Sequence, residues 1–151
     1  MTATSHAIVG SVIAAKVGNP SLAIPLALAS HLILDSIPHW DTATNGHCKG
    51  GVTRRVFRNS IVDVLFGFIL SYLLIYFLFP GTNLLYVFLL IIMSQLFDWL
   101  MVPYYFFGIE KPFFKSIYKF QKLFDNELDK PWGIVTQFAT AIAAIFIGKI
   151  I

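Results

Sequence analysis

The segment Ser30–Asp41, SHLILDSIPHWD, joins the end of an apolar run to a cluster of polar side chains. His31 and Asp35 are four residues apart, so on a helix they lie one turn apart on the same face. Pro38 disfavours helical geometry at Ile37, which predicts that the helix ends just before that residue. We therefore expect an apolar helix that carries an imidazole and a carboxylate near its C-terminal end.

The side chains of this segment also make a candidate metal site. An imidazole and a carboxylate at this spacing can hold one cation, as histidines one helical turn apart do in zinc sites. His39 and Asp41 would leave the helix end on extended backbone and could fold back over the same point. The alternative is a histidine–carboxylate hydrogen bond at a helix end, followed by two solvated polar residues. The segment alone leaves both interpretations open.

The composition is that of a membrane protein. Of the 151 residues, 57% are hydrophobic and 13% are charged, whereas about a quarter of the residues in a soluble domain are charged. The formal net charge of +3 is small, and the basic residues cluster in two segments. That distribution suits membrane topology better than nucleic-acid binding. The single cysteine, Cys48, rules out an internal disulfide and a cysteine-rich zinc site.

Apolar stretches divide the chain into membrane-associated helices. Two short stretches, Met1–Val17 and Ser21–Ile37, flank a Gly-Asn-Pro breaker and predict a helical hairpin that is short for the bilayer. Three longer stretches predict full transmembrane helices. They are Ile61–Phe79, Leu84–Phe107 and Trp132–Ile151.

A basic segment before the last span predicts an interfacial helix. Within Gly108–Lys130, apolar residues recur at helical spacing from Phe113 to Leu128, with lysines between them. A helix with such a stripe lies in the membrane interface. The sequence therefore predicts an all-α polytopic membrane protein with a single domain, residues 1–151. It would contain about five helices, namely the short hairpin and three spans, together with the interfacial amphipathic helix.

The distribution of positive charge predicts the orientation in the membrane. Nine of the eleven lysines and arginines lie in the predicted loop Thr42–Asn59 or in Gly108–Lys130, and only Lys16 and Lys149 lie elsewhere. Loops rich in lysine and arginine stay in the cytoplasm, so both segments are expected there. We therefore expect a multi-pass protein of the inner (plasma) membrane with a cytoplasmic N-terminus.

This topology brings further polar residues to the cytoplasmic side of the predicted bundle. An ionised carboxylate in a lipid-facing span costs about 2.5 to 3.5 kcal/mol, and Lys16 is the one basic residue within the stretches that carry these acids. A bound divalent cation would supply the missing positive charge. Histidine and carboxylate ligands suit Zn²⁺ first, with Mn²⁺ or Fe²⁺ as alternatives. The candidates are His6, His31, Asp35, His39, Asp41, Asp63 and Asp98.

Each candidate outside the first segment also has a simpler interpretation. His6 could cap a helix or form a hydrogen bond at its start. Asp63 could pair with an interfacial arginine, and Asp98 could bond with Gln95 or a tyrosine. The sequence leaves these alternatives open.

The opening T-x-x-x-H pattern and the segment Ser30–Asp41 resemble a prokaryotic family of small inner-membrane proteins classed as metal-dependent hydrolases. More distantly, the H-xxx-D run followed by Pro-His is similar to a run in zinc-dependent phospholipase C and the P1-type nucleases. In those enzymes the run lies on a helix and binds a cluster of zinc ions. The resemblance extends through Asp41, and it implies metal binding by His31, Asp35 and His39, with His6 as an extra ligand.

Together, the residues and the resemblance predict a metal-dependent hydrolase of a phosphoester, such as a lipid-linked one, at the cytoplasmic membrane interface. A carboxylate near the metal would act as general base on a water that the metal activates. The alternative is a non-enzymatic membrane protein in which the cluster is a structural metal site or forms an ion or proton path. The expected partners are membrane lipid and the phosphoester substrate, with no nucleic acid. The candidate metal ligands are His6, His31, Asp35, His39 and Asp63, and the candidate catalytic residues are Asp41 and Asp98.

Overall fold

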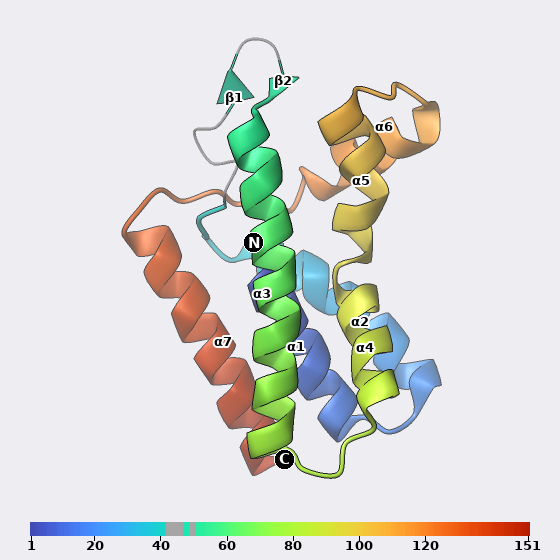
Figure 1. Ribbon diagram of the computed structural model, residues 1–151, viewed down its shortest axis with the longest axis vertical. Coiled ribbons are helices and arrows are strands. Elements are labelled where there is room, and N and C mark those ends of the chain that lie inside the picture. Colours follow the sequence, from blue (N-terminus) through green and yellow to red (C-terminus); the bar gives the residue numbers. More distant parts are fainter. Residues whose placement is uncertain (42–46, 49–50) are drawn as a thin grey trace.

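The computed structural model describes residues 1–41, 47–48 and 51–151, and in these ranges the chain forms seven α-helices and one very short β-hairpin (Figure 1). The all-α class predicted from the sequence is confirmed, whereas the seven helices exceed the five that were expected together with one interfacial helix. The helices are α1 (Ala3–Lys16), α2 (Pro20–Ser36), α3 (Arg54–Leu78), α4 (Leu84–Ser94), α5 (Leu96–Phe107), α6 (Pro112–Gln121) and α7 (Trp132–Ile150). The antiparallel strands are β1 (His47–Cys48) and β2 (Gly51–Val52).

Two helix boundaries differ from the prediction because of local capping and packing. α3 begins at Arg54, within the segment predicted as a loop, because the Thr53 hydroxyl accepts a hydrogen bond from the Val56 amide at 3.3 Å. The predicted interfacial helix ends at Gln121 and so does not reach Leu128. The remaining predicted loop residues, 42–46 and 49–50, lie outside the described residues.

A bend divides the predicted span Leu84–Phe107 into two helices. α4 ends at Ser94 and α5 starts at Leu96, with an angle of 48° between the two axes. Gln95 lies at the break and is almost fully buried. The predicted span is therefore bent, and its polar residue Gln95 lies at the bend.

α1 is the central helix of the bundle and packs against α2, α3, α4 and α7 (Figure 1). Glycines allow this close approach: a Cβ atom at Gly10 would lie 2.8 Å from the carbonyl oxygen of Leu90. On α3, a Cβ atom at Gly67 would lie 2.9 Å from the Cα atom of Thr4. These distances are shorter than side chains tolerate, so small residues set the spacing of the helices.

The chain after α2 forms backbone hydrogen bonds with the segment between α6 and α7. α2 ends at Ser36, as predicted from the proline that follows it. The His39 amide donates to the carbonyl oxygen of Asn126 at 3.0 Å, and the Leu128 amide donates back to the carbonyl oxygen of His39 at 2.6 Å. The Asn126 amide also donates to the Asp35 carbonyl oxygen at 2.9 Å. These bonds hold the end of α2 in place.

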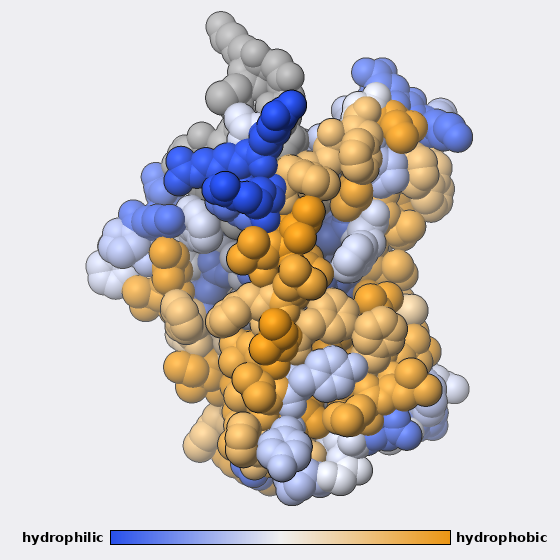
Figure 2. All heavy atoms as spheres, in the orientation of Figure 1, coloured by the Kyte–Doolittle hydropathy of each residue, from blue (hydrophilic) through white to orange (hydrophobic). Residues whose placement is uncertain are grey.

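The surface has the character expected of a membrane protein. α3 and α7 are each long and apolar enough to cross a membrane, and α4 with α5 adds a third candidate if the bent pair is one span. Figure 2 shows a broad hydrophobic surface across the middle of the molecule, with hydrophilic groups gathered toward its ends. Phe138, Ile142 and Phe146 extend the apolar surface along α7 and are exposed.

The basic residues of the described chain are distributed unequally between the two ends of the molecule. The arginines at the start of α3 and the lysines of α6 lie at the upper end in Figure 1. The ammonium groups of Lys16 and Lys149 lie 5.9 and 5.2 Å from the ring centre of Phe79, which follows the lower end of α3. Lys49 lies outside the described residues.

Candidate metal centre

Four of the seven candidate residues meet where α1, α2 and α5 approach one another. His6 Nε2 lies 3.1 Å from Asp35 Oδ1, and His31 Nε2 lies 3.2 Å from Asp35 Oδ2. His31 Nε2 also lies 3.7 Å from Oδ1 of Asp98, which comes from α5. Both histidine side chains are completely buried, whereas the side chain of Asp98 is 29% exposed.

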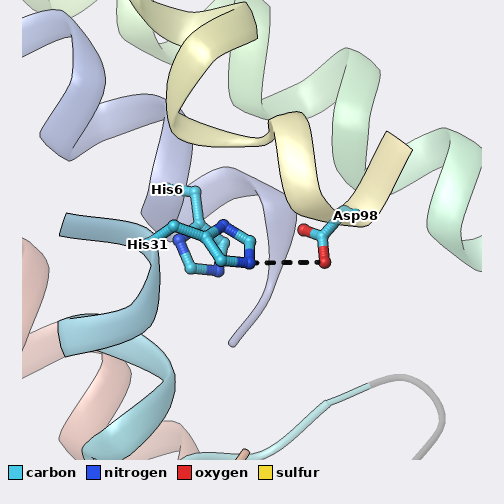
Figure 3. Close-up of side chains that lie close together, drawn as sticks. All are labelled: His6, His31 and Asp98. Carbon is cyan, nitrogen blue, oxygen red and sulfur yellow. Dashed lines mark ion pairs between the residues drawn. The ribbon is translucent and has the colours of Figure 1, made fainter. Parts of the chain in front are cut away.

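The two imidazole rings are stacked on each other beside Asp98 (Figure 3). The centres of the His6 and His31 rings are 4.1 Å apart, and the angle between the ring planes is 20°. His6 Nδ1 has no hydrogen-bond partner among the described residues, whereas His6 Nε2 faces Asp35 Oδ1 at 3.1 Å. A buried polar atom without a partner is costly, so the Nδ1 atom of His6 indicates a polar partner, such as water or an ion, that the described chain does not supply.

The orientation of His31 is fixed by the backbone of α4. His31 Nδ1 lies 2.8 Å from the carbonyl oxygen of Ser94. Because a carbonyl oxygen can only accept, this contact assigns the hydrogen to Nδ1, and in the neutral ring the Nε2 lone pair faces Asp35 and Asp98. Metal-binding histidines characteristically donate their other ring N–H to a carbonyl or carboxylate group in this way.

The break between α4 and α5 makes this arrangement available. α4 ends at Ser94, and carbonyl groups in the last turn of a helix lack intrahelical partners. The Ser94 carbonyl oxygen accepts from His31, and the Ser94 hydroxyl donates to the backbone carbonyl oxygen of His6 at 2.9 Å. Ser94 therefore bonds to both histidine residues and links their helices to α4. The sequence analysis did not predict this role, although the polar residues within the stretch Leu84–Phe107 could have indicated it.

Gln121, the last residue of α6, is a further member of the site that the sequence did not predict. Its Nε2 atom lies 2.6 Å from Asp98 Oδ1 and 3.2 Å from His31 Nε2. Asp98 thus has this glutamine as its partner, and not Gln95 as considered from the sequence. Gln121 follows Ile117 by four residues, so its place on the apolar face of α6 was the available signal.

The donor set fits a divalent metal ion. With metal–ligand distances of about 2.0 to 2.2 Å, ligand atoms around a tetrahedral zinc lie about 3.3 to 3.5 Å apart, and the histidine–carboxylate distances of 3.1, 3.2 and 3.7 Å bracket this value. One ligand atom from each of His6, His31 and Asp98 can be chosen so that all three lie within 4.8 Å of one another. The amino nitrogen of Met1 lies 2.5 Å from Asp35 Oδ1 and is the cationic group at that oxygen.

Asp63, a residue of α3, lies against the start of α1 and not among the four residues of the candidate metal centre. Its Oδ2 atom accepts from the Ala3 amide at 2.6 Å, and its Oδ1 atom accepts from the Thr4 hydroxyl at 2.6 Å. These bonds satisfy donor groups at the N-terminus of the helix. The structure therefore places the Asp63 carboxylate as a cap of α1, in contrast to the predicted metal ligand and to the alternative of an arginine partner.

His39 also lies apart from the two stacked histidines, against the segment after α6. Its Nδ1 atom contacts the carbonyl oxygen of Ile37 at 2.8 Å, and its Nε2 atom lies 3.2 Å from Asp125 Oδ1. Lys122 Nζ lies 2.6 Å from the other oxygen of Asp125 and 2.6 Å from Glu127 Oε1. Burial acts to raise the pKa of Asp125, but the hydrogen bonds with His39 and Lys122 outweigh it and lower the pKa to about 2.

A cavity of about 530 Å³ opens beside the candidate metal centre. Its walls are mostly apolar and aromatic side chains of α3 and α5, and its polar lining includes the buried side chains of Asp35 and Gln95. Figure 2 shows a recess between α3 and α5 with hydrophilic groups inside a hydrophobic rim. Among the described residues, Lys122 is the basic side chain of the lining, and the Met1 amino group pairs with Asp35. The acidic residues of the lining are Asp35, Asp41, Asp63, Asp98, Asp125 and Glu127.

The acidic excess bears on what the cavity can bind. Several carboxylates around one space repel one another and attract cations. Asp41, predicted as a catalytic residue, contributes to this lining, as does Asp98. The cavity thus combines acidic residues that attract cations with apolar walls.

Comparisons with known proteins do not identify a family for this chain. No family model, no curated protein and no solved structure matches the chain. The resemblance to membrane-bound metal-dependent hydrolases therefore remains a prediction from the motifs.

Proposed function

We propose that this protein is a metal-dependent hydrolase that cleaves a phosphoester at the membrane. One observation carries the proposal: two buried, stacked histidines face two carboxylates beside a cavity large enough for a substrate. His31 has its Nδ1 atom against a backbone carbonyl, and the Nε2 atoms of both histidines face carboxylates. The bond of His31 Nδ1 to a carbonyl is typical of imidazoles that bind a metal through Nε2.

Zinc is the metal that this donor set suits best, with manganese or iron as alternatives. His6, His31 and Asp98 would hold it, and Asp35 lies in contact with both histidines to complete the set. A zinc ion in such a site supplies Lewis acidity and lowers the pKa of water to about 7. Asp98, predicted from the sequence as catalytic, is thereby assigned to metal binding.

The side chains that line the cavity supply the remaining chemistry. Hydrolysis forms a bond between a water oxygen and phosphorus and breaks the bond from phosphorus to the ester oxygen. Asp41, which lines the cavity, is the proposed general base that takes a proton from the water. The ester oxygen would leave with the proton that Asp41 takes from the water, and Asp41 would return to its carboxylate form. Gln121 positions Asp98, and the Ser94 carbonyl positions His31.

The proposed location is the cytoplasmic side of the inner membrane. The arginines at the start of α3 and the lysines of α6 lie at one end of the molecule, and the positive-inside rule assigns this end to the cytoplasm. Asp63 lies nine residues after Arg54 on α3, a rise of about 13 Å. Because Asp63 caps α1, the N-terminus and the site would lie inside the cytoplasmic leaflet.

A structural metal site or an ion path is the competing function. The cavity beside Asp98 favours an enzyme, since a purely structural site has no need of space for a substrate. On the far side of the site the described core is apolar and well packed, which disfavours a continuous polar path across the bundle. That core includes Val12, Ile13, Ile75, Phe79, Val87, Leu90 and Ile91.

Metal content and phosphoesterase activity, measured on the same preparations, test this function. Wild-type protein in detergent should hold zinc in stoichiometric amount and should release nitrophenol from bis(p-nitrophenyl) phosphate. His31→Ala should lose both properties, as should His6→Gln, in which a polar side chain of similar size replaces the imidazole. Asp129→Asn, an exposed substitution at a residue outside the cavity lining, should keep both.

The outcomes separate the parts of the proposal. Absence of stoichiometric zinc, manganese or iron from the wild type would remove the metal site. A metal-loaded wild type that cleaves no phosphoester would leave a structural metal site. Full metal retention in both folded histidine variants would show that the metal is bound elsewhere.

A further inference from the structure

Gln95 carries a buried amide group that the protein does not satisfy. The residue is 1% exposed, and neither Oε1 nor Nε2 has a hydrogen-bond partner in the described part of the chain. The side chain lies at the break between α4 and α5 and lines the cavity beside Asp98. An orphaned amide is destabilising, so its position indicates a polar group that occupies the cavity when the protein functions.

The cavity walls indicate the kind of molecule that carries this polar group. Ile61 and Leu65 of α3 line the cavity and are 46% and 57% exposed. Trp99 and Phe107 of α5 line the opposite wall and are 44% and 63% exposed. Both walls belong to candidate membrane-spanning elements. The hydrophobic rim in Figure 2 would therefore contact lipid and not water.

We propose that the cavity binds a phosphate-bearing amphiphile from the bilayer, with its hydrocarbon between α3 and α5 and its polar group on the Gln95 amide. This substrate class rests on the proposed function for the phosphate itself. The inference that the ligand carries a hydrocarbon chain rests only on the apolar walls of the cavity. Entry between two helices lets a lipid keep its chain in the membrane while its ester reaches the metal centre.

The lining offers a phosphate little positive charge from the chain's side chains, so the metal ion and neutral donors such as the Gln95 amide would have to bind it. Lys122 is the basic side chain of the lining, and Asp125 and Glu127 each bind it at 2.6 Å. The acidic lining repels a free phosphate, so the site needs a metal to accept one. The Gln95 amide is neutral and offers N–H donors to phosphate or ester oxygens without adding charge.

Substitution of Gln95 by leucine tests the inference against a matched control. Gln137 is also a buried glutamine, but it is bonded: its Oε1 atom accepts from the Thr2 hydroxyl at 2.7 Å, and its Nε2 atom donates to the Trp40 carbonyl oxygen. Gln95→Leu removes an orphaned amide and should raise the Tm of the ligand-free protein. Gln137→Leu removes a satisfied amide and should lower the Tm.

Binding is measured on zinc-loaded protein in maltoside detergent with two probes that share one phosphomonoester. Dioctanoyl phosphatidic acid carries acyl chains, and glycerol 3-phosphate carries none. The wild type should bind the lipid at least about tenfold more tightly than the chain-free probe. Gln95→Leu should weaken lipid binding by about tenfold or more, the change expected from one lost hydrogen bond to a charged group. Its zinc content should not change, and Gln137→Leu should bind the lipid as the wild type does.

Equal affinity for the two phosphates would overturn the inference and indicate a soluble phosphoester. Unchanged lipid affinity in Gln95→Leu would also overturn it, because water would then satisfy the amide. Failure of the proposed function is separate: wild-type protein without metal that still binds the lipid through its chains would refute the hydrolase and retain the amphiphile site.

Discussion

Replacement of Gly10 by alanine perturbs the contact that holds α1 against the end of α4. A Cβ atom at this position would lie 2.6 Å from Ser94 Oγ and 2.8 Å from the carbonyl oxygen of Leu90. Ordinary contact starts at 3.4 Å, so clearing the carbonyl requires a shift of about 0.6 Å. The backbone oxygen cannot rotate away, and Ser94 Oγ is engaged with the His6 carbonyl oxygen. The shift must therefore move α1, and His6 with it.

The structure provides the magnitude of the expected effect. Overpacking of this kind costs about 1 to 3 kcal/mol, and the better helix propensity of alanine offsets about 1 kcal/mol. Gly10→Ala should thus lower the free energy of unfolding by about 0 to 2 kcal/mol. Metal sites tolerate errors of about 0.2 Å in ligand distance. We expect the displacement of His6 to lower zinc affinity by about tenfold or more.

Two measurements check this prediction against a matched variant. Thermal unfolding in detergent reports stability, and titration against a competing chelator reports zinc affinity. Gly18→Ala is the control, because a Cβ atom at Gly18 has nothing within 4 Å. It should keep the wild-type zinc affinity. If Gly10→Ala and Gly18→Ala match in both Tm and zinc affinity, the α1–α4 contact does not position the metal centre.

Three further predictions address the ligands, the pH dependence and the topology. Asp35→Asn and Asp98→Asn should each lower zinc affinity about tenfold or more, and the double variant should lose less than the sum because both groups act on one site; strictly additive losses in chelator titrations would separate the two residues. The pKa of Asp125 is lowered to about 2 from 3.8. Above about pH 4 its carboxylate therefore stabilises the fold, by about 1 to 2 kcal/mol after allowance for solvent. This stabilisation is lost as the pH falls toward 2. Thermal unfolding across this range should show the loss in the wild type and not in Asp125→Asn, and identical profiles would contradict the assigned ion pair. A reporter fused after Ile151 should read extracytoplasmic, whereas a cysteine at Arg54 should resist membrane-impermeant reagents, and the reverse labelling would invert the topology.

Features of the chain that depend on local sequence were predictable. The length of an apolar stretch that crosses a membrane is set by bilayer thickness, so α3 and α7 could be recognised as candidate spans from the sequence. The end of α2 follows from the steric demand of Pro38 on the residue before it. The pairing of His31 with Asp35 follows from helical geometry, since residues four apart share a face.

Features that depend on which distant element packs nearby were not predictable. Local spacing placed His39 beside the metal candidates, but backbone pairing with the segment after α6 brings it to Asp125. Asp63 became the cap of α1 because α3 passes the start of that helix.

The completion of the candidate metal centre also depends on tertiary contacts. The Ser94 carbonyl is a backbone group whose availability depends on a helix break, and no residue letter encodes that. Gln121 reaches Asp98 only because α6 folds back against α5. Side-chain periodicity is a property of one helix, whereas a binding site depends on the relative placement of several, and packing in three dimensions decides that placement.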